Sequence, residues 1–272
     1  MNLSETFIAL SNEAQFTRDM LGGGATQIRK ANYAQKGVYF QAFTSLSTGL
    51  ERIGKICLML DHYIKNNGEF PDINYMKREI GHNIFLLYEK SLKISAEYAI
   101  SFNYQNELNG DIHQNILKIL SEFALGDRYS NINVLVGVRQ ANDPISLWFN
   151  KVDTPLFEKH VAKKRKEKIV QNAQLIDHLT SQFVRVMHIS ETGSLIQQVE
   201  EGSFRTGMYE AVAPYRQLYV IQIIRFWAEL SRGLQYKAME LCNQDIPFLS
   251  EIFAPFYNPD AYIKTRKTWD KI

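Results

Sequence analysis

The stretch YFQAFTSLSTGLERIGKICLMLDHYI, residues 39–64, decides the fold, because its apolar side chains recur every three or four residues. Between Lys36 and Ile64 the members of this series are Phe43, Leu46, Leu50, Ile53, Cys57, Leu60 and Ile64. Since an α-helix turns by about 100° per residue, these positions form one stripe on a single helix. The stretch therefore predicts a long amphipathic helix whose stripe is buried.

The same periodicity recurs on both sides of this helix, interrupted by turn-forming residues such as Asn66-Asn67-Gly68 and Asn109-Gly110. No clear run of alternating β-branched residues and no internal repeat is present. We therefore predict an all-α multi-helix bundle with one long amphipathic helix and a second helical half. The expected division is a bundle at residues 1–140 and a helical extension at 141–272, with one continuous domain as the alternative.

Glycine and proline positions set the predicted boundaries of the other helices. Gly22-Gly23-Gly24 predicts the end of a short first helix and a flexible break. Pro155 predicts the start of a helix that reaches His188. Residues 190–207 then form a flexible connection, and Pro214 starts the next apolar helix.

Length and charge bound the class of protein. At 272 residues and 45% hydrophobic composition, the chain can bury one large core or two modest ones. The 31 Lys and Arg against 29 Asp and Glu leave a net charge of +2, too small for an overall field that attracts nucleic acid or membrane. The N-terminus lacks a signal-peptide pattern, and no apolar run is long enough to cross a bilayer. We expect a cytoplasmic protein without a membrane partner.

No metal or cofactor site is expected. The six histidines include no pair at the i, i+4 spacing of a helical zinc site, and no cysteine pair has ligand spacing. The segment GGGATQIRK, which begins at Gly22, lacks both the preceding strand and the Gly-Lys-Ser/Thr ending of a nucleotide-binding loop. A G-x-S-x-G nucleophile motif is also absent.

Polar residues of the first half form the most suggestive set. They are Glu51, Arg52 and Lys55 on the long helix, the junction Gly81-His82-Asn83, and Arg128, Tyr129 and Asn131. If their helices pack as neighbours, these groups converge at one mouth of the bundle, where cations face a phosphate or an acidic partner. The alternative is a polar network that fixes helix register, with His82 as a helix cap and Arg128 paired with Glu51.

A basic run lies in the second half, in the segment KHVAKKRKEKI at residues 159–169. Its cations are Lys163, Lys164, Arg165, Lys166 and Lys168. They suffice for several phosphate contacts on one helix, and a solvated helix face is the alternative. No aromatic residue interrupts the cations, so base stacking is not indicated.

Three segments carry a family resemblance: residues 39–64, GHNIFLLYEK at 81–90, and RYSNINVL at 128–135. Over about residues 36–140 the chain resembles bacterial helical proteins of the HEPN type, including abortive-infection-like members. The resemblance implies a helical bundle, frequently dimeric, in toxin–antitoxin, phage-defence or RNA-processing contexts. It also implies metal-independent RNase chemistry, in which an arginine and a histidine with four to six residues between them activate a ribose 2′-hydroxyl and stabilise the phosphorane.

The chain departs from that spacing. Three residues separate Arg78 from His82, two separate Arg185 from His188, and no histidine follows Arg128 closely. Lys55 and His62 have the spacing, but a lysine cannot fork two hydrogen bonds onto a phosphate. His82 and Arg128 are therefore the candidates for acid–base catalysis and phosphate binding.

The expected function is a bacterial defence or stress-response protein that acts through RNA or protein binding, as a homodimer, with degenerate RNase activity. One alternative is a noncatalytic interaction module whose partner covers exposed aromatic side chains near the C-terminus, at Phe248, Phe253, Phe256 and Tyr257. Another is binding of a nucleotide or phosphorylated metabolite by Glu51, Lys55, His82 and Arg128.

Overall fold

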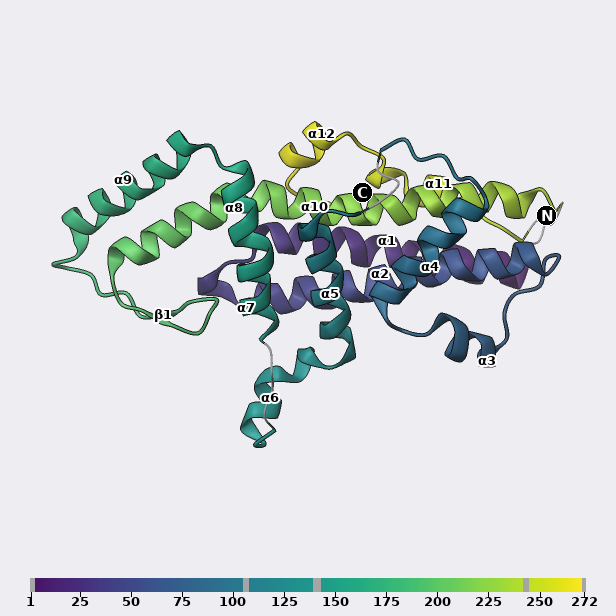
Figure 1. Cartoon of the computed structure of the whole chain (residues 1–272), viewed down its shortest axis with the longest axis horizontal. Coiled ribbons are helices and arrows are strands. Elements are labelled where there is room, and N and C mark those ends of the chain that lie inside the picture. The colour runs from purple at the N-terminus through teal and green to yellow at the C-terminus, as the bar shows by residue number, and fades with distance from the viewer. Residues whose placement is uncertain (1–2, 105–107, 139–142, 242–244, 271–272) are drawn as a thin grey trace.

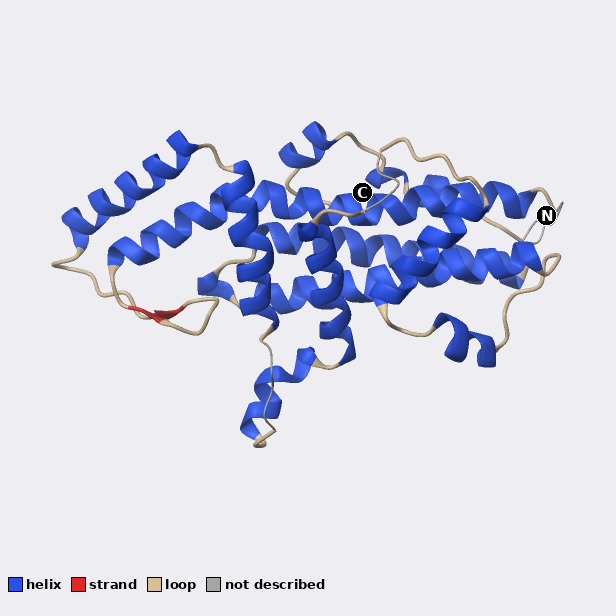
Figure 2. Ribbon diagram, viewed as in Figure 1, coloured by secondary structure: helices blue, strands red, loops and turns tan. Residues whose placement is uncertain are grey.

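The computed structural model describes residues 3–104, 108–138, 143–241 and 245–270. Within these ranges the regular structure is helical apart from one two-stranded antiparallel sheet (Figure 2). The all-α prediction is therefore confirmed. The predicted division at residues 140–141 lies outside the described ranges. Within them, no helix combines the length and the apolar character that crossing a bilayer requires.

Three long helices lie side by side and form the body of the molecule (Figure 1). They are α1 (Glu5–Lys30), α2 (Gly37–Lys65) and α10 (Val199–Met239). The apolar stripe predicted for residues 39–64 is the buried face of α2, where Leu50 is 1% exposed. Each of the three helices packs on the other two, so the stripe faces a shared core.

The glycine triplet lies inside α1, which continues to Lys30, so the predicted break at this point is wrong. A Cβ on Gly24 would lie 2.6 Å from Cγ of Leu46 in α2. In return, a Cβ on Gly49 of α2 would lie 2.7 Å from Cγ of Leu21. Relative to alanine, glycine in a helix interior costs about 1 kcal/mol. Here the absence of side chains at Gly24 and Gly49 allows α1 and α2 to approach closely.

Gly22 has a different neighbour, since a side chain there would overlap the backbone carbonyl of Trp269. The Trp269 amide also donates a 2.7 Å hydrogen bond to the hydroxyl of Thr26 on α1. The Trp269 side chain is buried. This segment from the far end of the sequence is therefore seated on the glycine face of α1.

Helix α10 begins at Val199 and runs through Pro214, so the predicted start at Pro214 is wrong. The expected flexible connection at 190–207 contains strand β2 (Leu195–Ile196), paired with β1 (His188–Ile189), and the first turns of α10. Interior proline removes one helical hydrogen bond. Packing of α10 along α1, α2 and the shorter helices offsets that loss.

Shorter helices pack across the body or cover it. The first half adds η1 (Tyr33–Gln35), α3 (Ile73–Tyr75), π-helical η2 (Met76–Ile80), α4 (Ile84–Glu97), α5 (Asp111–Leu125), η3 (Asp127–Tyr129) and α6 (Ser130–Leu135). The second half adds α7 (Pro144–Trp148), π-helical η4 (Phe149–Asp153), α8 (Thr154–His160), α9 (Lys163–Thr180), α11 (Leu249–Ile252), η5 (Ala254–Phe256) and α12 (Asp260–Thr265). Helix α6 lies on an arm that projects from the body (Figure 1).

The single helix predicted from Pro155 to His188 is wrong, because α8 ends at His160 and α9 spans Lys163–Thr180. Helix α9 folds back beside α10 (Figure 1) and buries Ile169 and Ala173. Its remaining large apolar side chains stay largely exposed. Leu179, for example, is 60% exposed.

A buried ion pair and the hydrogen bonds to it connect four elements. The Arg216 guanidinium of α10 donates two hydrogen bonds of 2.6 Å to the Asp153 carboxylate of η4. Both side chains are almost fully buried. Tyr39 of α2 and Trp148 of α7 complete the network with further hydrogen bonds to Asp153. A network of this kind fixes the register of neighbouring helices, because each buried group depends on its partners.

Candidate functional site

The structure brings together three of the predicted polar side chains, from α2 and from the junction before α4. The Glu51 carboxylate is 2.7 Å from the Lys55 ammonium and 2.9 Å from Nδ1 of His82, through the same oxygen. Lys55 Nζ is also 3.0 Å from that Nδ1. The Glu51 and Lys55 side chains are mostly covered, whereas the His82 side chain is 70% exposed.

The Glu51 contact favours one tautomer of His82. A carboxylate can only accept hydrogen bonds, so this contact is a hydrogen bond when Nδ1 carries the proton and donates. In that tautomer the nearby Lys55 ammonium, which can only donate, bonds to Glu51 and not to the imidazole. Neutral His82 then holds its free lone pair on Nε2. Lys55 donates to the same carboxylate oxygen. An exposed imidazole with an oriented basic nitrogen and a neighbouring ammonium can accept a proton beside a bound anion.

The remaining predicted residues of the first half serve other contacts. Arg52 donates to both oxygens of Glu13 on α1, at 2.7 Å each. Asn83 is the N-cap of α4, where its side chain accepts from the Leu86 amide. The expectation that His82 caps this helix is therefore wrong.

Arg128 and its neighbours lie at the base of the projecting arm. The Arg128 guanidinium lies 5.0 Å from the ring centre of Tyr129, within η3. Asn131 is exposed on α6. The alternative pairing of Arg128 with Glu51 is wrong, since Glu51 binds Lys55 and His82 instead.

The basic run forms the first turns of α9. Lys163, Lys164, Arg165 and Lys168 are exposed there. Lys166 is half-buried and its ammonium contacts the Glu158 carboxylate of α8 at 2.5 Å. The run is therefore a cationic helix face that adjoins α8.

The aromatic residues of the C-terminal part do not form the exposed patch that the interaction-module alternative requires. Phe253 and Phe256 are fully buried, and Tyr257 donates to the Ala228 carbonyl of α10. Phe248 alone of these four is largely exposed, at 53%. These side chains serve the core and hold the C-terminal segment on α10.

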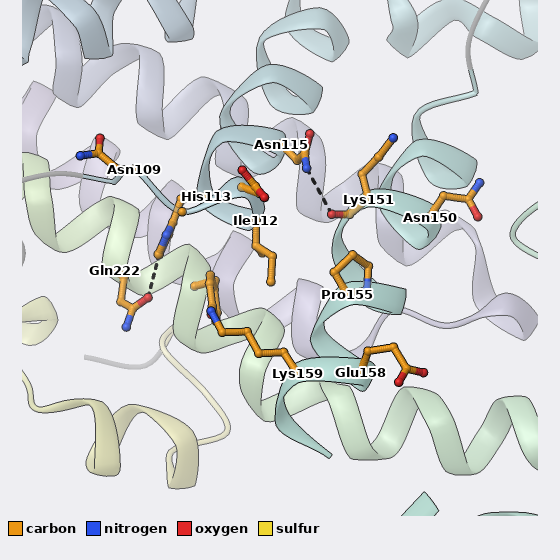
Figure 3. Close-up of a pocket in the computed structure, with 13 residues that line it drawn as sticks. Asn109, Ile112, His113, Asn115, Asn150, Lys151, Pro155, Glu158, Lys159 and Gln222 are labelled. Carbon is orange, nitrogen blue, oxygen red and sulfur yellow. Dashed lines mark hydrogen bonds between the residues drawn. The ribbon is translucent and has the colours of Figure 1, made fainter. Parts of the chain in front are cut away.

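The sequence did not indicate a polar cleft of about 1030 Å³ between α5, η4, α8 and α10 (Figure 3). Its walls carry Asn109, Gly110, Asp111, Ile112, His113, Asn115, Asn150, Lys151, Pro155, Glu158, Lys159, Tyr219 and Gln222. These residues are spread over more than a hundred positions of the chain, and they include no spaced motif. Only the three-dimensional packing brings them to one place.

His113 is the most buried titratable group of this cleft, at 5% exposure. Its Nε2 is 2.8 Å from Oε1 of Gln222, as Figure 3 shows. The Gln222 amide nitrogen donates to the Asp260 carboxylate at 2.9 Å. Burial lowers the pKa of His113, because the imidazolium form would lose its hydration. The imidazole is therefore neutral near pH 7.

Within the described ranges, no three His, Cys, Asp or Glu side chains are grouped as a metal site would require. The Glu51–Lys55–His82 cluster and the cleft are thus two sites built from hydrogen-bonding and cationic groups. In comparisons with known proteins, no family model, no curated protein and no solved structure significantly matches the chain.

Proposed function

We propose that the protein binds RNA and cleaves it weakly by transesterification at His82, in a bacterial defence or stress-response role. The observation that carries this proposal is the 2.9 Å contact between Glu51 and Nδ1 of His82. It orients an exposed imidazole as a base, which proton abstraction from a ribose 2′-hydroxyl requires. The resemblance of residues 36–140 to HEPN-type proteins supports the same chemistry.

In the proposed reaction, Nε2 of His82 takes the proton of the 2′-hydroxyl. The 2′-oxygen attacks the adjacent phosphorus, and the bond to the 5′-oxygen breaks as that oxygen takes up a proton. The products are a 2′,3′-cyclic phosphate and a 5′-hydroxyl. Lys55 lies 3.0 Å from Nδ1, on the other side of the ring, and is paired with Glu51, so its charge acts on the phosphorane only from a distance. A single ammonium binds phosphate less specifically than a guanidinium, so we expect slow cleavage.

RNA binding would use the exposed cations of α9. Lys163, Lys164, Arg165 and Lys168 share one end of that helix, and each phosphate they neutralise releases counterions. Replacing Lys164 and Lys168 together by glutamine should weaken RNA binding and lower the slope of log K against log salt by about 2. Gel-shift titrations at several salt concentrations measure this. Lys77→Gln/Lys93→Gln, exposed elsewhere, is the matched control.

The cleavage proposal is tested with purified wild type and with His82→Ala, Glu51→Gln and Arg128→Ala variants on labelled single-stranded RNA. Loss of the base should lower the rate by about 100-fold or more. Glu51→Gln should lower it less, because the imidazole remains but loses its orientation. Product analysis should find cyclic phosphate ends.

His178→Ala is the matched control, since this histidine is exposed on α9 away from the cluster, and it should cleave at the wild-type rate. Circular dichroism of each variant separates loss of chemistry from loss of folding. Equal cleavage by wild type, His82→Ala and Arg128→Ala would remove both residues from the reaction.

A further inference from the structure

The cleft between α5, η4, α8 and α10 contains an unused hydrogen-bond acceptor. Gln222 donates through its amide nitrogen to Asp260, so its oxygen faces His113 and accepts from Nε2–H. Neutral His113 therefore has a lone pair on Nδ1. Within the described ranges, this buried nitrogen has no hydrogen-bond partner.

Nδ1 of His113 faces the first turn of α5. A Cβ on Gly110, the N-cap of that helix and a lining residue of the cleft, would lie 3.3 Å from it. Glycine provides no side-chain cap, and the first amides of an α-helix have no partner within the helix. This end of the cleft thus combines one unpaired acceptor with the backbone donors of a helix N-terminus, and these groups match a hydroxyl group once the His113 ring turns Nδ1 towards the cleft.

The charges of the cleft favour an anion. Two lysines, Lys151 and Lys159, face two carboxylates, Asp111 and Glu158. Glu158 is neutralised by Lys166, so the lysines exceed the carboxylates that remain. Lys159 reaches towards Tyr219, whose ring centre lies 5.7 Å from its ammonium. In Figure 3, Lys151 and Glu158 lie across the cleft from His113.

We propose that this cleft binds a sugar phosphate or nucleotide, with the phosphate at Lys159, Lys151 adding positive charge from the opposite wall, and a sugar hydroxyl donating to Nδ1 of His113. A volume of about 1030 Å³ accommodates a ligand of that size. The ligand satisfies the buried acceptor and the excess positive charge at the same time. The proposal uses none of the residues assigned to RNA cleavage, and it stands if that assignment fails.

The test is isothermal titration of the full chain with ribose 5-phosphate, AMP, ribose and inorganic phosphate. Ribose 5-phosphate and AMP should bind, and each should raise the melting temperature. Lys151→Gln/Lys159→Gln should raise the Kd for both at least 10-fold. His113→Gln should remove the preference for ribose 5-phosphate over inorganic phosphate. His178→Ala, on α9 outside the cleft, should bind as wild type does.

The phosphate could belong to a free nucleotide or to the 5′ end of an RNA. A 5′-phosphorylated and a 5′-hydroxyl oligonucleotide distinguish these sources: binding of AMP supports the first, and binding of only the phosphorylated oligonucleotide supports the second. Either result supports the ribose-phosphate site. Absence of binding by every phosphorylated probe would overturn it, and so would equal affinity of wild type and the double lysine variant.

Discussion

Helices α2 and α9 both carry apolar residues at helical spacing, yet they use them differently. In α2 the stripe from Phe43 to Leu60 is buried against α1 and α10. In α9 only Ile169 and Ala173 are buried among the described side chains, and Leu179 is 60% exposed. Periodic spacing therefore identifies a helix in both cases, but the number of neighbouring helices decides how much of its apolar surface is buried.

Two leucines give the largest expected difference between these helices. Leu50→Ala in α2 should cost about 2–5 kcal/mol of unfolding free energy, because it leaves a cavity in a packed core. Leu179→Ala in α9 removes the same atoms from a largely exposed position, so its effect should stay within about 0.5 kcal/mol. Urea denaturation of both variants measures the difference. A comparable loss in the two would mean that α9 is covered in solution.

Glycine-to-alanine substitutions test the same comparison where each helix contacts its neighbour. Gly24→Ala should destabilise by about 1–3 kcal/mol, because the new methyl overlaps Leu46 of α2. Gly207→Ala should loosen only the docking of α9, since its methyl would meet Ile169 at 2.6 Å. Hydrogen exchange should then rise in α9 more than in α2.

Gly23→Ala is the matched control, because a Cβ there meets nothing within 4 Å. Relief of the helical cost of glycine should stabilise this variant by about 0.5–1 kcal/mol. If Gly23→Ala and Gly24→Ala shift the urea midpoint in the same direction, close approach of α1 and α2 does not explain the triplet.

The smallest expected effect is the contribution of the buried histidine His113 to the pH dependence of stability. Burial holds the pKa of His113 below its ordinary value, so the folded protein stays unprotonated there while the unfolded chain takes up a proton below about pH 6.5. The unfolded state then binds more protons, and stability falls as the pH falls. His113→Gln should reduce this loss between about pH 7.5 and pH 5.5.

His160, whose pKa burial also lowers, contributes in the same direction and should leave part of the pH dependence in place. An identical pH profile for wild type and His113→Gln would show that His113 is not neutral and buried in solution.

Local pattern predicted the helical class and the limits of α2, because its stripe needs no information from distant residues. The glycine triplet and Pro214 were misread for the opposite reason. Both residues weaken an isolated helix, and only contacts with α2 and the rest of the body offset that cost.

Of the two candidate sites, only the contacts between residues near in sequence could be predicted. Glu51 and Lys55 are one helical turn apart, so their pairing follows from spacing alone, and His82 joins them only through the packing of its junction on α2. His113 and Gln222 are 109 residues apart, and no periodicity indicates their contact. The cleft therefore could not be predicted from the sequence.

The contact between Trp269 and α1 can form only late in the synthesis of the chain. Thr26 and Trp269 are 243 residues apart, so a ribosome that adds about 5–20 residues per second makes the second roughly 12–50 s after the first. Throughout that interval Trp269 does not cover the face of nascent α1 that carries Gly22 and Thr26. This contact therefore forms only after Trp269 has been made, and until then this face is open to chaperones.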